Sequence, residues 1–128
     1  MTHNELSGVI LEAAIEIHRR LGPGLLESVY QIILAHELVK RGLSVKMEIP
    51  IPLVWDNLHF DVGFRADMVV NDLILIELKC VEEIARVHKK QVLTYLRLTG
   101  KKLGLLINFG DETLKDGVSR IINGTLDE

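Results

Sequence analysis

The sequence predicts an α/β fold of the α+β type, in which helices pack against a mixed β-sheet. Two stretches near the N-terminus carry apolar residues at three- and four-residue steps, as amphipathic helices do. Between residues 45 and 79 the period changes, and the pairs Asp56-Asn57 and Asn71-Asp72 separate extended stretches, as in an antiparallel meander. A further helical stretch and a short apolar run follow. The expected order of elements is therefore α-α-β-β-β-α-β.

Glycines bound the two N-terminal helices. The apolar periodicity predicts a first helix over about residues 4–20, and Gly22-Pro23-Gly24 ends it. A second helix is predicted over about residues 25–41, with Gly42 as its C-terminal stop.

Three strands form the predicted meander. The first covers residues 45–55 and contains Pro50 and Pro52, which indicate an edge strand or a bulge. The second covers about residues 60–70. The third covers 73–79 and is apolar on both faces until its end, so we expect other elements to cover both of its faces.

The C-terminal part returns to helical spacing over residues 82–99, with Gly100 as the stop. Residues 103–109 are a short apolar run and are interpreted as a buried strand. The tail over 111–124 is ambiguous, because Val118 to Ile122 fits either a last strand or a short helix.

Composition narrows the class of protein. The chain has 128 residues, of which 48% are hydrophobic and 26% charged, so we expect one globular domain over residues 1–128. The net charge of −3 argues against a strongly basic, general nucleic-acid binder. The charge is uneven, however. The segment from Lys79 to Lys102 holds seven basic and two acidic residues, a local charge of +5.

The sequence also indicates a compartment. Cys80 is the single cysteine, so an intrachain disulfide framework and a multi-cysteine zinc site are excluded. The first residues do not form a signal peptide, and no apolar run approaches the ~20 residues that span a bilayer. We expect a cytoplasmic protein that does not bind a membrane.

Three ionisable residues stand out at the end of the buried third strand. Glu77 and Lys79 share one face by alternation. A turn centred on Asn71-Asp72 would place Asp67 opposite residue 76, one step from Glu77. Two close carboxylates repel, and a divalent cation with oxygen ligands, Mg²⁺ or Mn²⁺, would resolve that repulsion. The alternative is that Lys79 forms a structural salt bridge with either acid and that the residues have no catalytic role.

These residues resemble a known family. Asp67, followed by Glu77-x-Lys79 on the next strand and then a helix, is similar to the motif of the PD-(D/E)XK nuclease superfamily. The stretch from Gly24 to Tyr30 matches the signature that names the GxxExxY family of that superfamily. The resemblance implies a restriction-endonuclease-like core. One departure is Ala66, which stands where the superfamily name has proline.

The resemblance also implies residue roles. Asp67 and Glu77 would be catalytic metal ligands, with Glu27 as a further carboxylate for Mg²⁺ or Mn²⁺. Lys79 would position or activate the attacking water and stabilise charge on the phosphate. Gln91 would be a polar catalytic residue beside the site. For Glu27 the alternative is an acid favoured by the helix dipole, and for Gln91 it is a structural hydrogen bond.

The leading hypothesis is a Mg²⁺-dependent endonuclease or exonuclease that acts on nucleic acid, with DNA preferred over RNA. Arg86, Lys89 and Lys90 would contact the phosphate backbone. A homodimer, which would let two sites address two strands, is a further hypothesis. The alternative is a non-catalytic nucleic-acid-binding or protein-assembly module that keeps the nuclease fold.

Overall fold

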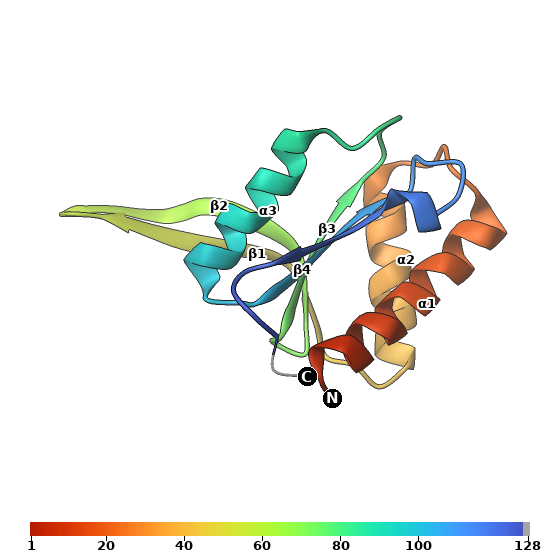
Figure 1. Ribbon diagram of the computed structural model, residues 1–128, viewed down its shortest axis with the longest axis horizontal. Coiled ribbons are helices and arrows are strands. Elements are labelled where there is room, and N and C mark those ends of the chain that lie inside the picture. The colour runs from red at the N-terminus through yellow and green to blue at the C-terminus, as the bar shows by residue number, and fades with distance from the viewer. Residues whose placement is uncertain (127–128) are drawn as a thin grey trace.

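A computed structural model of the chain describes residues 1–126 and contains a five-stranded sheet with helices on both faces (Figure 1). The strand order is β1-β2-β3-β4-β5, in which β3 and β4 are parallel and the other neighbours are antiparallel. The elements are α1 (His3–Leu21), α2 (Glu27–Lys40), β1 (Val45–Trp55), β2 (Leu58–Val70), β3 (Ile74–Lys79), α3 (Arg86–Thr99), β4 (Leu103–Asn108), the 3₁₀ helix η1 (Lys115–Gly117) and β5 (Val118–Ile122).

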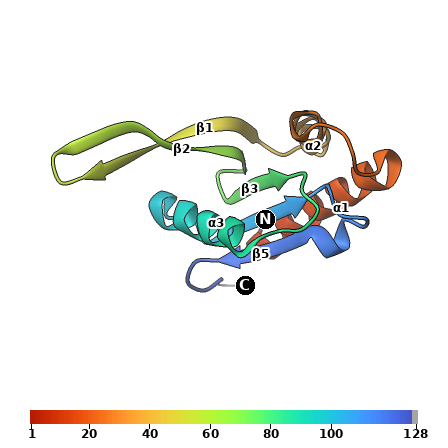
Figure 2. The same ribbon diagram turned by 90° about the horizontal axis from the view of Figure 1, so that it is seen from above.

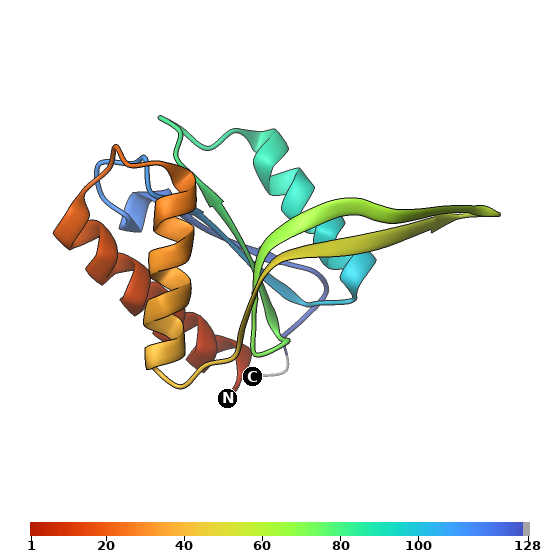
Figure 3. The same ribbon diagram turned by 180° about the vertical axis from the view of Figure 1, so that it is seen from behind.

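Helices α1 and α2 cover one face of the sheet (Figure 3). Thr2 and Glu5 form a capping box at the start of α1, which satisfies backbone N–H groups at the helix end. The apolar sides of both helices pack against alternate residues of the sheet. We call this cluster the α1–α2 core, and its fully buried members include Leu6, Ile10, Tyr30, Leu34, Met68, Ile74, Ile76 and Phe109.

Helix α3 covers the opposite face and forms a smaller cluster, the α3 core (Figure 2). Its buried members are Ala66, Leu75, Val92, Leu96 and Leu106. Gly104 on β4 allows the close packing, because a Cβ there would lie 2.7 Å from a methyl group of Val92. Both faces of β3 and β4 are therefore buried, as the apolar run of β3 predicts.

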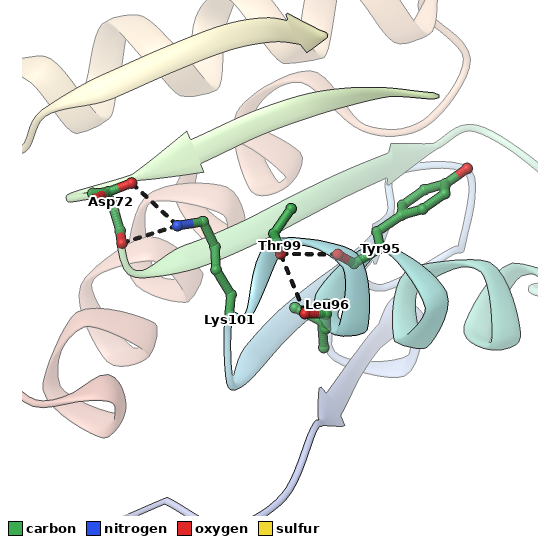
Figure 4. A network of polar contacts seen from close by, with 5 residues as sticks. All are labelled: Asp72, Tyr95, Leu96, Thr99 and Lys101. Carbon is green, nitrogen blue, oxygen red and sulfur yellow. Dashed lines mark hydrogen bonds and ion pairs between the residues drawn. The ribbon is translucent and has the colours of Figure 1, made fainter. Parts of the chain in front are cut away.

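Polar contacts hold the C-terminal end of α3 against the turn between β2 and β3 (Figure 4). The Thr99 hydroxyl donates to the carbonyl oxygens of Tyr95 at 2.8 Å and Leu96 at 3.3 Å. The Lys101 ammonium donates to the carbonyl and to a carboxylate oxygen of Asp72, both at 3.1 Å. The Lys101 charge is thus paired within the protein.

The predicted α+β fold is confirmed, with one strand more than the predicted order contains. The ambiguous tail forms β5, which pairs antiparallel with β4. The predicted helix over 82–99 begins only at Arg86, so its first four residues are not helical. The reason lies in Asn108, whose side-chain amide bonds both the N–H and the carbonyl of Val81 and fixes the chain there.

Strands β1 and β2 form a long hairpin that extends beyond the helices (Figures 1 and 2). Only the last three residues of β2 pair with β3, so most of the hairpin has no third strand. As predicted, β1 is an edge strand, and the hairpin register shifts between Ile51 and Leu53, where Pro52 of β1 stands opposite residues 61–63 of β2. The extra residues of this bulge are therefore on β2, and a Cβ on Gly63 would lie 2.9 Å from the Leu53 Cβ. Within residues 1–126, no helix is long and apolar enough to cross a membrane.

Candidate active site

Asp67 and Glu77 meet where the ladder between β2 and β3 stops. The last backbone pair of that ladder is Met68 with Ile76. Beyond this pair, backbone N–H groups donate to side-chain carboxylates instead of to backbone carbonyls. The Asp67 N–H donates to Oε1 of Glu77 at 3.1 Å, and the Leu78 N–H donates to Oδ2 of Asp67 at 2.9 Å. The two carboxylates therefore lie side by side, each anchored by a backbone amide.

The predicted register was wrong by one residue. Residue 76 lies opposite Met68, and one further step brings Asp67 level with Glu77. Asn71 and Asp72 form the expected turn, with positive φ at both residues and a hydrogen bond from the Leu73 N–H to the Val70 carbonyl. Val70 nevertheless pairs with Ile74, so Leu73 is an extra residue after the turn. This bulge brings the two acids closer than the sequence predicted.

A distortion in the hairpin places Asp67 at this point. The β1–β2 ladder skips the level of Glu48 and Asp67, and Glu48 has a φ of 52°. The regular alternation of β2 is broken here. Ala66 and Met68 are two residues apart and would normally share a face, yet Ala66 belongs to the α3 core and Met68 to the α1–α2 core. Asp67 lies at this crossover, where its side chain reaches β3 instead of following the regular alternation.

Burial raises the pKa of both carboxyls. Glu77 is only 8% exposed. Desolvation, followed by the charge of Asp67, raises the pKa of Glu77 to about 8. Burial is also the main cause that raises the pKa of Asp67, against the opposing effect of the Leu78 N–H. In the absence of a cation, Glu77 keeps its proton near neutral pH and shares a hydrogen bond with Asp67.

Lys79 is half-buried at the end of β3, on the α3 side of the sheet like Leu75 and Glu77. Its positive charge lowers the pKa of both acids, yet it forms no ion pair with them within residues 1–126. The alternative of a plain salt bridge therefore does not describe this cluster. The ammonium lies near the acids and is not neutralised by direct contact.

Glu27 is the first residue of α2, and the chain before it is tightly fixed. The Tyr30 hydroxyl donates to the Gly22 carbonyl and accepts from the Leu25 N–H at 3.2 Å, while Gly24 takes a φ of 111°. Tyr30 is fully buried and stacks on Phe109 at 4.5 Å. The spacing of Gly24, Glu27 and Tyr30 is thus a structural unit that presents Glu27.

Glu27 is electrostatically part of the cluster although its side chain is largely exposed. Partial burial, followed by the charge of Asp67, raises the pKa of Glu27, and Lys79 lowers it. Its carboxylate therefore lies within electrostatic reach of the acids of the sheet, and its place in the first turn of α2 also fits the helix-dipole alternative.

Three residues that sequence reasoning did not assign to the site also border it. Gln31 is buried on α2, and its amide donates to Oε1 of Glu48 and to the Asp67 carbonyl, both at 2.9 Å. The charge of Glu48 raises the pKa of both Asp67 and Glu27. Burial and then the charges of Glu77 and Asp67 raise the pKa of Tyr95, whose ring stacks on Phe64 at 3.8 Å.

Sequence signals for these three residues were weak. Gln31 lies one helical turn after Glu27, and Tyr95 one turn after Gln91, so both share a helix face with a predicted site residue. Glu48 carries no such signal. Its backbone has a positive φ, which glutamate rarely adopts, so the sequence does not predict this conformation.

The other predicted residues lie on α3. Gln91 is exposed and forms no hydrogen bond with the acids within the described chain, although Tyr95 follows one turn later on the same face. Arg86, Lys89 and Lys90 are all exposed in the N-terminal half of the helix. The structure thus brings Asp67, Glu77, Lys79 and Glu27 together and leaves the four α3 residues at the surface.

The donor set fits a hard divalent cation in part. Asp67 and Glu77 offer adjacent carboxylates whose repulsion has no cationic partner in direct contact. Within residues 1–126, no three His, Cys, Asp or Glu side chains already form a metal-binding group. Two carboxylates are therefore in place, and a third protein ligand requires a side-chain movement.

Comparison with known proteins agrees with this geometry. The model of the PD-(D/E)XK nuclease superfamily matches residues 4–121, a range that runs from α1 to β5. No curated protein and no solved structure matches the chain significantly.

Proposed function

The chain belongs to the PD-(D/E)XK nuclease superfamily, and from this premise we propose that it is a metal-dependent nuclease that hydrolyses phosphodiester bonds, with DNA as the preferred nucleic acid. The observation that carries the proposal is the cluster of Asp67, Glu77 and Lys79. In this cluster two desolvated acids lie near a lysine, and neither acid forms an ion pair with it. A purely structural role does not account for the burial of two adjacent acids, because their two backbone hydrogen bonds offset only part of the cost of desolvating them.

We propose Asp67 and Glu77 as the ligands of a divalent cation, Mg²⁺ or Mn²⁺, and Glu27 as the third carboxylate. Members of the superfamily generally use divalent metal ions. When bound, such an ion supplies a water of lowered pKa and neutralises charge on the phosphate. The backbone amides of Asp67 and Leu78 hold the two carboxylates in place for it.

Lys79 is proposed to orient the attacking water and to stabilise the negative charge that develops on the phosphate. Its half-buried position without an ion pair leaves the ammonium available for that contact. Gln91 is proposed as a polar group that orients substrate beside Tyr95.

The exposed side chains of Arg86, Lys89 and Lys90 are proposed to bind backbone phosphates, which would position the nucleic acid without reading its sequence. We also propose that the chain belongs to the GxxExxY group, which Gly24, Glu27 and Tyr30 support as one structural unit. The unpaired Cys80 supports a reducing compartment, and we propose the cytoplasm.

A cleavage assay tests the proposal. Purified full-length protein is incubated with Mg²⁺ or Mn²⁺ and with single-stranded, duplex and branched DNA and RNA of equal length. Cleavage of DNA is expected, with loss of at least about 100-fold in Lys79→Gln and Asp67→Asn. The matched control is Lys40→Gln, at the other end of α2 from Glu27, which should cleave at the original rate.

Metal binding separates an inactive nuclease fold from an enzyme. Calorimetric titration with Mn²⁺ should show binding to the original protein and none to Glu77→Gln, while the control Glu16→Gln, at a partly exposed acid of α1, binds normally. Binding of nucleic acid without any cleavage would favour the alternative of a non-catalytic module. Cleavage that persists in Lys79→Gln and Asp67→Asn would refute the proposed site.

A further inference from the structure

The β1–β2 hairpin carries an apolar face that runs from the core to the hairpin tip. Alternate residues of β1 pair with apolar residues of β2 on this face: Ile49 with Ala66, Ile51 with Phe64, Leu53 with Phe60, and Trp55 with Leu58. Directly opposed residues of an antiparallel pair share a face, so these four pairs form one apolar stripe. We call the part beyond the α3 core, residues 51–62, the arm.

Burial along this stripe falls from the root of the hairpin to its tip. Ala66 is fully buried in the α3 core, and the Phe64 ring is stacked on Tyr95. Ile51 and Leu53 are half-buried. At the tip Trp55 is 69% exposed and Leu58 57%, and Phe60 is 48% exposed. The apolar stripe thus continues past the helix that covers its first part (Figures 1 and 2).

An uncovered ribbon of this kind has little stability of its own. A two-stranded hairpin is marginally stable in water without a third strand or a packed face. In the arm neither is present, because β3 pairs only with residues 68–70 of β2. On this face the exposed parts of Trp55, Leu58, Phe60 and Val62 amount to roughly 400 Å² per chain, when 150–250 Å² is taken for a large side chain. A patch of this size is typical of an interaction site.

The charge of the arm argues for a protein partner. Residues 53–64 contain Asp56 and Asp61 and no lysine or arginine, so the phosphate backbone of a nucleic acid would be repelled there. Strand addition along the outer edge is also unfavourable, because Pro50 and Pro52 lack N–H donors on β1. The partner must therefore pack on the apolar face rather than extend the sheet.

We propose that the arm is the interface of a homodimer, in which the apolar faces of two arms pack on each other about a twofold axis. Such an interface needs no second surface, because the same patch is complementary to itself. Two ribbons stacked face to face form a small sandwich with a spacing of ~10 Å. The proposal does not depend on the nuclease activity proposed above.

The area indicates the strength of this dimer. Two arms would bury about 800 Å² in total, which is below the standard size of stable interfaces and typical of weak, reversible association. We therefore expect association in the micromolar range, with Trp55 and Phe60 as the side chains that contribute most.

Sedimentation velocity of the full chain between about 1 and 100 μM tests the proposal. The expected result is a reversible shift from 14.4 kDa to twice that mass. Leu58→Glu and Phe60→Glu should weaken the dimer about 30-fold or more, because each places a charge on the apolar face that the interface buries. Both positions are exposed in the single chain, so folding should persist and is checked by circular dichroism. Ile32→Glu, at a residue of α2 that is 62% exposed, is the matched control and should dimerise normally.

The single tryptophan gives a second readout at the interface itself. Trp55 emission should shift to shorter wavelength as the chain concentration rises, and this shift should disappear in Phe60→Glu. A chain that stays monomeric at 100 μM, or a dimer in which Trp55 remains water-exposed, overturns the proposal. So does a dimer that Ile32→Glu breaks as readily as Phe60→Glu, or a change in Trp55 emission that occurs only when DNA is added.

Discussion

Asp67 donates its backbone N–H to the Glu77 carboxylate at 3.1 Å, and in this way two acids that repel each other are held as neighbours. A second hydrogen bond, from the Leu78 N–H to the Asp67 carboxylate, completes the arrangement. These two bonds replace a rung of the β2–β3 ladder beyond Met68. Because backbone amides rather than cations anchor the two acids, a bound ion can favour the ionised form of Glu77, which is protonated near neutral pH without it.

The first prediction concerns Glu77 and pH. The folded-state pKa of Glu77 is about 8, above its ordinary value of 4.5, so the folded form favours the protonated acid. This contribution to stability is fully present below pH 4.5 and is lost as the pH rises to about 8. Glu77→Gln keeps the acceptor for Asp67 and cannot ionise. It should therefore melt higher than the original protein at pH 8 in EDTA.

Thermal unfolding at a series of pH values checks this, and the advantage of Glu77→Gln should shrink to near zero towards pH 4.5. Addition of Mn²⁺ should reverse the order, since only the original protein gains binding energy. Equal melting temperatures at all pH values, with or without Mn²⁺, would contradict both the raised pKa and the metal site. Glu16→Gln, at a partly exposed acid of α1, is the matched variant that removes a carboxylate outside the site.

Periodicity and turn residues predicted the architecture well because burial imposes them directly. The alternation that put Glu77 and Lys79 on one face holds in the structure, since β3 is regular to its end. The register to Asp67 failed because Leu73 is inserted after the turn, and no sequence signal marks such an insertion. The site therefore could be named from the sequence, while the contact between its acids could not.

Long-range contacts account for the residues that were missed. Gln31 looks like an ordinary polar helix residue, and its role depends on Glu48 and Asp67, which lie far along the chain. The start of α3 was placed too early for a similar reason, because Asn108 binds the segment around Val81 from a distant strand.

Gln31 supports the second prediction. Its amide satisfies the Asp67 carbonyl and holds Glu48, so Gln31→Leu leaves both without this donor at a partly buried position. We expect a loss of about 1–3 kcal/mol in the free energy of unfolding. Urea denaturation measures it, with Gln91→Leu as the control at the exposed glutamine of α3. A larger loss in Gln91→Leu than in Gln31→Leu would be inconsistent with this role.

Tyr30 supports the third prediction, which concerns the loop before Glu27. Tyr30→Phe keeps the ring stacked on Phe109 but removes the hydroxyl that bonds the Gly22 carbonyl and the Leu25 N–H. The loop before Glu27 should loosen, with a loss of roughly 1–2 kcal/mol in stability. Hydrogen exchange should show faster exchange of the Leu25 amide, while amides of α1 exchange as before. Unchanged protection at Leu25 would mean that the hydroxyl does not hold this loop.

The last prediction tests Asn108, which is fully buried and joins two loops behind the site. Its carbonyl oxygen accepts from the N–H groups of Val81 and Gly110, and its amide donates to the Val81 carbonyl and the Asp111 carboxylate. Asn108→Leu removes all four bonds and leaves buried backbone groups unpaired, so a loss of about 3 kcal/mol or more is expected. Asn123→Leu, at a half-buried asparagine with a single side-chain bond to Lys101, is the control. Lys79 lies shortly before the anchored residue Val81. Metal-dependent cleavage by Asn108→Leu should therefore fall even at temperatures where the variant stays folded. Cleavage at the original rate would show that this anchor does not position Lys79.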